Sequence, residues 1–390
     1  MRLAEADVVV CVEGFFEMGG TERQAVNIAV GLRSRGTAVA LLSRWPLSTE
    51  NVYVKELLAA GVPVIARGWV GRGTSPVDRL GVYMAKLRAA GRERSLVASA
   101  WAWQRRQLEK GAKRRPVLHE IPFFGRVPPE GRRVLTALAL PVVHSTFGSP
   151  SEGPPAPATR GAVLTSDGSS CADERFRFIP TMAATVVDGS LASSTETLPH
   201  AFFAGRMVRS KGVEVLIEAA ALVPGLRLRL AGQGSAVEDL MSLAARKRVP
   251  AEFLGRLSPA RLAAEFARCH VTVVPSLPTE LGEGVPTVVG ESLAAGTPVV
   301  ASAVGGTPYL DRLIGDREIL KLVVPGRVED LAHALRSAID GWHTSLSTRA
   351  REAHTRFLSP EAILPQYEDC YSEARAQQPA LTASTDYKQV

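Results

Sequence analysis

Cysteine is scarce in this sequence, and its spacing excludes two kinds of site. The four residues, Cys11, Cys171, Cys269 and Cys370, form no C-x-x-C pair and no dense disulfide framework. Such usage is typical of a reducing cytoplasm, so a cytoplasmic protein is predicted. The N-terminal residues predict a strand preceded by acidic side chains and not a cleaved signal peptide.

The sequence also lacks a long apolar run. Residues 137–143, for example, are interrupted by Pro141, and a membrane-spanning helix needs about 20 apolar residues in succession. No transmembrane helix is therefore predicted. Contact with the surface of a membrane stays open as an alternative.

What the sequence does have is the composition of a folded protein that is long enough for two domains. Its 390 residues are 46% hydrophobic and 22% charged, which is an ordinary globular profile, and domains usually hold about 100–200 residues. The net charge of +7 suits an anionic partner such as nucleic acid, a membrane or a phosphorylated substrate. A GC-rich genome explains the excess of arginine equally well, so charge alone does not choose among these readings.

Short apolar runs alternate with longer amphipathic runs through most of the chain. Buried parallel strands are expected at residues 8–12, 38–42, 62–66, 201–204, 226–230, 271–275 and 298–301. Helices are expected at residues 21–35, 212–221, 236–247 and 259–269. This alternation predicts doubly wound α/β sheets.

Two stretches poor in apolar residues indicate where the domains end. Residues 149–171 are rich in Pro, Gly and Ser, which predicts loops around at most one short strand. Residues 187–198 form a second soft stretch, directly before a strand. The first domain is therefore predicted to span residues 1–197 and the second residues 198–352. The polar residues 377–390 predict a disordered tail.

The first strand is followed by a glycine turn and a helix. Gly19 and Gly20 allow the backbone to approach a ligand, and Thr21 with Gln24 is a capping-box pattern. The N-terminus of a helix in this position binds anionic oxygen readily. A plain strand–helix turn explains the same residues, since neither G-x-G-x-x-G nor the P-loop motif is present.

Two cations occupy the corresponding loop at the start of the second half. Arg206 and Lys211 follow the strand at 201–204 and precede a helix. Ligands of open α/β sheets bind at the carboxyl ends of the strands, so this pair can neutralise a diphosphate. Two solvated surface charges are the simpler alternative.

Two further segments of the second half have weaker patterns. Gly232 and Gly234 follow a strand, but Val237 stands where a dinucleotide motif has its third glycine, so a turn is predicted. Residues 253–255 predict a short strand and turn, whose exposed backbone can pair with the edge of a nucleobase.

The densest pattern is a pair of glutamates around the start of a helix. Seven residues separate Glu283 from Glu291, and Pro286 is placed as the first helical residue. The free N–H groups near Thr287 and Val288 can hold phosphate. Glu283 can then accept hydrogen bonds from a sugar, and Glu291 from a ribose diol. This spacing is common by chance, but the flanking glycines and the strand that follows make chance a poorer explanation.

Taken in order, these segments resemble the retaining glycosyltransferases with the two-domain B-type fold (GT-B), family 4 in the usual classification. The matching segments are MGGTER, FFAGRMVRSKG, LRLAGQGS, FLGRLS, PSLPTELGEGVPTVVGESLAAGTPVVAS and the VGG turn after it. The resemblance covers most of the chain and is strongest from about residue 201 to 340. It implies two Rossmann-like domains facing a cleft, with a final helix, within residues 353–376, crossing back to the first domain.

The resemblance assigns most of the singled-out residues to a nucleotide-sugar donor. It implies that Arg206 and Lys211 bind the diphosphate, that Glu283 contacts the donor sugar and that Glu291 contacts the ribose. Residues 254–256 would border the base. The expected donor contacts are Gly19, Gly20, Arg206, Lys211, Leu254, Gly255, Arg256, Glu283, Gly284, Val285, Pro286, Thr287, Val288 and Glu291.

Catalysis is expected from Arg206, Lys211, Glu283 and a histidine. Relatives often place a histidine of the first domain near the donor sugar; His119 is the best positional match and His144 the second. A lone histidine after a strand is also often structural. The two cations would stabilise the charge that develops on the departing diphosphate. No metal and no cofactor are expected, because relatives work without a metal and the sequence has no Asp-x-Asp pair.

The sequence departs from the family pattern at three places. Ser292 follows the second glutamate where many relatives have alanine, Tyr309 stands about where many carry a glutamate, and Thr181-Met182 replace an Asn-Gly turn. These departures concern acceptor contacts more than donor binding.

The predicted function is transfer of a sugar, with retained configuration and without a metal, from a nucleotide diphosphate sugar to an acceptor hydroxyl. UDP is the first choice of nucleotide and GDP the second, and a soluble small molecule or glycan precursor is the expected acceptor. One open alternative is a nucleotide-sugar epimerase of the same fold. Another is a peripheral-membrane transferase with a lipid-linked acceptor, since residues 101–115 combine tryptophans with basic residues. No nucleic-acid partner is expected, because no recognised module is present.

Overall fold

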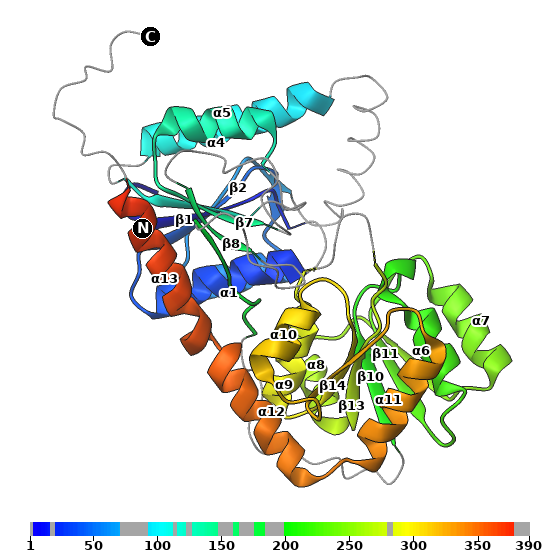
Figure 1. The fold of residues 1–390 in the computed structure, drawn as a ribbon. Coiled ribbons are helices and arrows are strands. Elements are labelled where there is room, and N and C mark those ends of the chain that lie inside the picture. The colour runs from blue at the N-terminus through cyan, green and yellow to red at the C-terminus, as the bar shows by residue number, and fades with distance from the viewer. Residues whose placement is uncertain are drawn as a thin grey trace.

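The computed structural model describes residues 3–15, 20–70, 93–111, 115–121, 127–146, 159–163, 175–183, 199–278 and 284–377. Within these residues the chain forms two large parallel sheets, one in each half, with helices on both faces of each (Figure 1). The predicted doubly wound α/β class is confirmed. The predicted linker at 187–198 and the tail beyond residue 377 lie outside the described residues.

The first sheet has the strand order β4-β2-β1-β6-β7-β8-β9, and its described pairs are parallel. β1 lies inside the sheet and pairs Val8 with Val39 on one side and with Val117 on the other. Helices cover both faces, so every residue of β1 is buried and the strand is apolar throughout. The strands are β1 (Val8–Val12), β2 (Val39–Ser43), β4 (Val64–Ala66), β6 (Val117–Ile121), β7 (Val142–Thr146), β8 (Thr159–Val163) and β9 (Phe176–Phe178), with β3 (Leu47–Ser48) and β5 (Trp69–Val70) forming a separate pair.

The helices of the first half divide between the two faces of its sheet. The core on one face includes α1 (Gly20–Ser34), α2 (Val52–Ala59) and α13 (Pro360–Ala376). The core on the other face includes α4 (Glu93–Gly111), α5 (Pro129–Leu138) and the 3-10 turn η1 (Leu3–Glu5). The start of α2 is capped by Asn51, whose side chain accepts hydrogen bonds from two backbone N–H groups.

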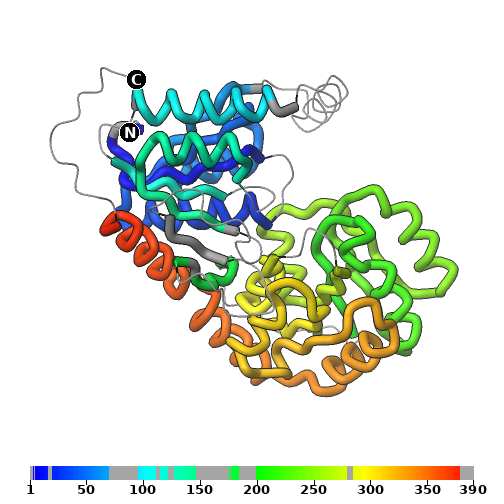
Figure 2. The backbone as a smooth tube through the Cα atoms, turned by 45° about the horizontal axis from the view of Figure 1, so that its top comes forward, coloured from blue at the N-terminus to red at the C-terminus, as the bar shows by residue number. Residues whose placement is uncertain are grey.

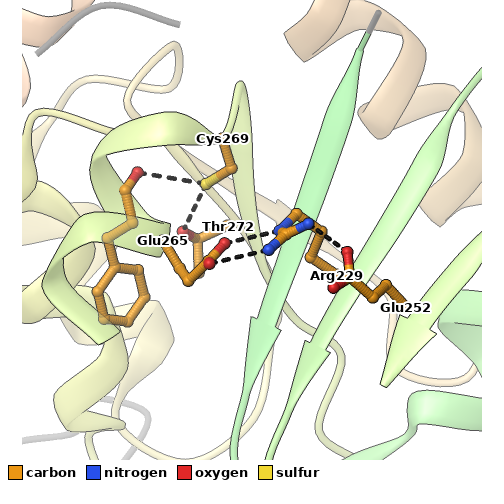
Figure 3. A network of polar contacts seen from close by, with 6 residues as sticks. Arg229, Glu252, Glu265, Cys269 and Thr272 are labelled. Carbon is orange, nitrogen blue, oxygen red and sulfur yellow. Dashed lines mark hydrogen bonds and ion pairs between the residues drawn. The ribbon is translucent and has the colours of Figure 1, made fainter. Parts of the chain in front are cut away.

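The second sheet has the strand order β12-β11-β10-β13-β14-β15. Its strands are β10 (His200–Ala204), β11 (Arg227–Ala231), β12 (Ala251–Gly255), β13 (Val271–Val274), β14 (Val299–Ser302) and β15 (Leu320–Val323). Its helices are η3 (Arg209–Lys211), α6 (Val213–Ala220), α7 (Val237–Lys247), α8 (Pro259–Arg268), α9 (Thr287–Ala295), α10 (Thr307–Ile314), α11 (Val328–Asp340) and α12 (Thr344–Phe357). On β11, Arg229 pairs with Glu252 of β12 and bonds both carboxylate oxygens of Glu265 on α8, at 2.6 and 2.9 Å (Figure 3).

The last helix returns the chain to the first half. In Figures 1 and 2 the trace runs from α12, which packs against α9 of the second half, into α13, which lies along the first sheet. Ile363, Leu364 and Tyr367 of α13 are buried in the core that β1 and α1 also form. The contact is close, since a Cβ at Gly31 of α1 would lie 2.6 Å from Leu364 Cδ1.

The outgoing and returning passages of the chain lie side by side. The backbone N–H of Ala183, which leads out of the first half, donates to the carbonyl of Leu358 at 3.0 Å, where the chain turns back. The ring of His354 lies 2.8 Å from the carbonyl of the same alanine. These bonds therefore join the two passages of the chain where it crosses between the halves.

Candidate functional site

Glycines bring the loops at the carboxyl end of the second sheet into contact. Gly212 has φ +64°, and a Cβ there would lie 1.9 Å from the carbonyl oxygen of Pro275. Gly232 has φ +139°, and its Cβ would lie 1.8 Å from the carbonyl oxygen of Gly205. Only glycine fits either position. The G-x-G pattern therefore allows two loops to pack closely, which agrees with the predicted turn and not with a dinucleotide motif.

Arg206 and Lys211 lie in the loop between β10 and α6. Arg206 is exposed, and Lys211 ends the turn η3, directly before the Gly212 that precedes α6. Both residues are at the carboxyl edge of the sheet, where ligands of parallel α/β sheets bind. The edge strand β12 ends nearby with half-buried Leu254, Gly255 (φ +62°) and exposed Arg256. The N–H of Gly232 donates to the carbonyl of Gly255 at 2.8 Å.

Helix α9 begins at Thr287, one residue later than expected, with Pro286 as its N-cap. No side chain among the described residues caps this end. The first-turn N–H groups, including those of Thr287 and Val288, therefore point out of the helix. Gly284 and Val285 lead into the helix, whereas Glu283 lies outside the described residues.

Two helix N-termini meet between the halves. Gly20, the first residue of α1, is exposed, and a Cβ there would lie 3.7 Å from Thr287 Cγ2 of α9. Each helix end carries a partial positive charge, so the pair forms a favourable place for an anion. Gly19 lies outside the described residues.

The predicted capping box does not include Gln24, because its side-chain amide bonds elsewhere. Its Oε1 accepts from the N–H of Met182 at 2.9 Å, and its Nε2 contacts the hydroxyl of Tyr367 at 3.5 Å. Asn27 of α1 donates to the carbonyl of Met182, at 2.9 Å, and Thr181 donates to the carbonyl of Val285, at 3.1 Å. Thr181-Met182, which stand in place of an Asn-Gly turn, thus connect α1 to the segment before α9.

Glu291 lies on the second turn of α9 and faces the first half. Burial raises the pKa of its carboxyl group, and the positive charge of Arg23 opposes that shift. Arg23 belongs to α1, pairs with Glu56 of α2 at 2.5 Å, and lies 5.9 Å from the ring centre of Tyr53. A carboxylate of the second half is therefore within electrostatic reach of a cation of the first.

Tyr309 occupies the region where relatives commonly have a glutamate, and it packs against the first half. Its ring lies 3.5 Å, centre to centre, from the ring of Phe178 at the end of β9. The residue therefore contributes an aromatic contact between the halves in place of a charge.

The structure corrects the role expected of His119. This residue lies in the middle of β6, not at the carboxyl end of the strand, and its side chain has no exposed surface. Its Nδ1 lies 2.8 Å from the hydroxyl of Tyr371 on α13, and its Nε2 lies 2.9 Å from the hydroxyl of Ser145 on β7. With both ring nitrogens engaged inside the core, His119 cannot contact a sugar here. Burial lowers its pKa to about 3, and His144 adds to the shift.

His144, the second choice, is also buried, on the opposite face of the sheet from His119. Burial lowers its pKa to about 4, and the charge of Arg44 adds to this shift. Its strand, β7, runs through the histidine instead of ending before it. Neither histidine is therefore placed at the junction of the halves.

A buried ion pair near the carboxyl edge of the first sheet was missed by the sequence analysis. Arg44 follows β2, and its Nη1 lies 2.7 Å from Glu120 on β6 and 2.7 Å from Gln104 on α4. The two charged side chains are only 1% and 0% exposed. The guanidinium lies 4.1 Å from the ring centre of Trp101. Burial also raises the pKa of Glu13, at the end of β1, while Arg44 opposes that shift.

No group of three or more potential metal-binding side chains occurs within the described residues. In the same residues, no helix is long and apolar enough to cross a membrane. Metal-independent chemistry remains a prediction, which chelation can test.

Residues 192–356 match the sequence family described as "Glycosyl transferases group 1". This region holds β10, α6, α9 and therefore the edge with Arg206, Lys211 and Glu291. The chain is 31% identical over 197 residues to an exopolysaccharide phosphotransferase of Streptomyces coelicolor, covering 47% of this chain and 19% of that protein. It is 32% identical over 185 residues to a D-inositol 3-phosphate glycosyltransferase of Corynebacterium aurimucosum, covering 44% of this chain and 42% of that protein. The chain thus spans less than half the length of these relatives.

Solved structures show the same fold over nearly the whole chain. A glycosyltransferase from Rickettsia africae matches with a TM-score of 0.70 and 14% identity, covering 95% of this chain and 99% of that one. Anabaena HepE, solved in complex with UDP-glucose, matches with a TM-score of 0.64 and 16% identity, covering 94% and 99%. Two Rossmann-like domains of the GT-B type are therefore confirmed.

Proposed function

We propose that this protein is a glycosyltransferase that moves a sugar from a nucleotide diphosphate sugar to an acceptor hydroxyl. The observation that carries the proposal is the meeting of the N-termini of α1 and α9, at Gly20 and Thr287. It lies in the fold of known glycosyltransferases, and α9 belongs to the region that matches their family. A diphosphate placed there is stabilised by both helix ends.

The donor would extend along the carboxyl edge of the second sheet. The diphosphate lies at the helix N-termini with Arg206 and Lys211, and the ribose diol donates hydrogen bonds to Glu291. Residues 254–256 border the base, and Glu283 binds hydroxyls of the sugar. UDP is the preferred nucleotide and GDP the second, in keeping with the UDP-glucose bound to the HepE structure.

The chemistry proposed is retaining, as in the family-4 enzymes that the sequence resembles, and independent of metal. As the bond from the anomeric carbon to the diphosphate breaks, negative charge develops on the leaving oxygen and the sugar gains oxocarbenium character. Arg206, Lys211 and the two helix N-termini stabilise that charge where it forms, and removing one such donor typically lowers kcat by about 10²–10³-fold. His119 takes no part, because its ring is enclosed in the core.

Calorimetric binding of UDP, GDP, ADP and their sugars, with and without EDTA, tests the proposal. We expect one nucleotide to bind with an affinity that EDTA does not change. Glu291→Ala should weaken that binding at least about 10-fold, which corresponds to the loss of about 1.4 kcal/mol from hydrogen bonds to a charged group. Glu214→Ala, an exposed carboxylate in the first turn of α6, is the matched control and should bind normally.

Two results would contradict the proposal. Failure of every nucleotide to bind would show that the proposed donor site does not exist. Binding that EDTA abolishes would leave a donor site but refute metal independence. Release of free sugar or nucleotide from the donor indicates transfer, whereas an epimerised donor indicates epimerisation.

A further inference from the structure

The surplus of positive over negative charge in this protein lies in its first half. Residues 1–197 contain 25 Lys and Arg against 18 Asp and Glu, whereas residues 198–390 contain 21 of each, so the first half holds the whole surplus of 7. Most of it falls between the start of α4 and the end of α5, where residues 93–138 contain 10 basic and 4 acidic residues. The surplus is therefore a local feature and not a general trait of composition.

The described part of this segment presents its cations to solvent. Helices α4 and α5 lie side by side on the side of the first half that faces away from the second (Figures 1 and 2). The exposed cations of this α4–α5 face are Arg105, Arg106 and Lys110 on α4, Arg115 before β6, and Arg133 on α5. Arg105 pairs with Glu109 at 2.6 Å. Within the described residues, Arg106, Lys110 and Arg133 form no ion pair.

The core holds α4 in the orientation that exposes these side chains. Trp101 and Leu108 are buried against the sheet, and Gln104 is bonded to the Arg44–Glu120 pair. The cations therefore cannot turn inward without breaking this packing. A cluster of like charges repels itself and disfavours the compact state. Binding of an anionic partner to this face would reduce that repulsion.

Tryptophans lie at one end of the α4–α5 face, the end nearer the carboxyl edge of the first sheet. Arg67, after β4, donates to Ser99 of α4 at 3.0 Å and lies 5.9 Å from the ring centre of Trp45. Trp69, two residues later, is 48% exposed. Trp103 lies on α4 itself and is partly exposed. Tryptophan side chains combine an apolar ring with a polar N–H and favour the boundary between lipid and water.

A bilayer fits this combination better than a nucleic acid does. Helices that read nucleic acid enter a groove singly, whereas α4 and α5 pack side by side and present their cations over two helices. The described residues contain no helix able to span a membrane, so attachment here would be peripheral.

We propose that the α4–α5 face binds an anionic lipid bilayer through its exposed cations and neighbouring tryptophans. Resting on the proposed function, this attachment would hold the transferase at a membrane surface, which is the peripheral-membrane alternative that the sequence leaves open. The face lies away from the second half, so a bound bilayer leaves the junction of the two helix N-termini free to take the donor (Figure 1).

Co-sedimentation of the full chain with vesicles tests the surface directly. The vesicles contain equal parts phosphatidylglycerol and phosphatidylcholine, or phosphatidylcholine alone. We expect sedimentation with the anionic vesicles only, and release in about 1 M salt, where the Debye length falls to about 3 Å. The triple variant Arg106→Gln/Lys110→Gln/Arg133→Gln should bind about 100-fold more weakly, because each cation near an anionic surface contributes about fivefold in affinity.

The matched control is Arg246→Gln/Lys247→Gln/Arg248→Gln, which removes three exposed cations from the second half and should bind like the wild type. Equal loss in both triple variants would show attraction by net charge and overturn the proposal. So would absence of sedimentation of the wild type, or binding to a single-stranded oligonucleotide without binding to vesicles. Nucleotide binding measured on the same variants separates this result from the proposed function, since neither triple variant should change it.

Discussion

The two halves of the molecule use the same kind of parallel sheet but place their charges differently. In the first half, Arg44 and Glu120 pair inside the core with at most 1% of either side chain exposed. In the second half, Arg229 connects Glu265, 5% exposed, to Glu252, 60% exposed, at the border of the sheet (Figure 3). A buried pair often stabilises a fold no more than apolar residues of the same size would. The Arg44–Glu120 pair is therefore weak evidence that the first half is the more stable one.

Sequence similarity follows the same division. The family match covers residues 192–356, which is the second half, with the edge proposed to hold the donor. The first half shares the fold of solved glycosyltransferases but lies largely outside that match. We therefore interpret the second half as the part that follows the sequence pattern of the family, and the first half as the part that shares the fold without that sequence match.

The largest expected effect is on the buried pair. Glu120→Gln should lower the free energy of unfolding by about 3–5 kcal/mol, because it leaves the Arg44 guanidinium charged and uncompensated inside the core. Urea unfolding followed by circular dichroism measures the loss. The double variant Arg44→Met/Glu120→Met should recover at least half of it. A loss of less than about 1 kcal/mol in the free energy of unfolding of the single variant would contradict this. The first half would then tolerate an unpaired charge as well as the second half does.

The next effect is on the dependence of stability on pH. The pKa of His119 is lowered by burial from 6.5 to about 3, so between these values the unfolded chain binds a proton that the folded protein does not. The free energy of unfolding should therefore fall as pH falls from 6.5 toward 3, by up to about 1.4 kcal/mol per pH unit for each such histidine. His119→Asn should reduce that slope by one proton in urea titrations at pH 6, 5 and 4. An unchanged slope would place the histidine in contact with water.

The smallest effect is expected on the surface of the second half. Lys247 lies 3.8 Å from Glu218, with side chains 46% and 36% exposed. Lys247→Gln should change the free energy of unfolding by no more than about 0.5 kcal/mol, because solvent screens such pairs. A loss above about 1 kcal/mol in the free energy of unfolding, measured in the same urea assay, would contradict the contrast between a buried pair in the first half and exposed pairs in the second.

The sequence predicts the second half in more detail than the first, for physical reasons. The strand at β10, the loop with Arg206 and Lys211, and the helix at α9 are signalled locally, by apolar runs, glycines and Pro286. For His119, the alternation of polar and apolar residues along the strand cannot predict the environment of the side chain, since β6 is buried on both faces.

Contacts between distant segments leave no local signal either. Arg44 reads as a solvated residue after a strand until the fold places Glu120, 76 positions away, 2.7 Å from it. The junction at Gly20 and Thr287 is of the same kind, because each helix start is visible in the sequence but their proximity is not.

The bonds between Ala183, His354 and Leu358 join the outgoing and returning passages of the chain at one place. Mechanically, these bonds tie the two passages of the chain together, so a rotation of one half against the other would move the atoms beside them least. Such a rotation would part the contacts of Thr181 with Val285 and of Phe178 with Tyr309. A substrate could then enter and leave without either sheet being rebuilt.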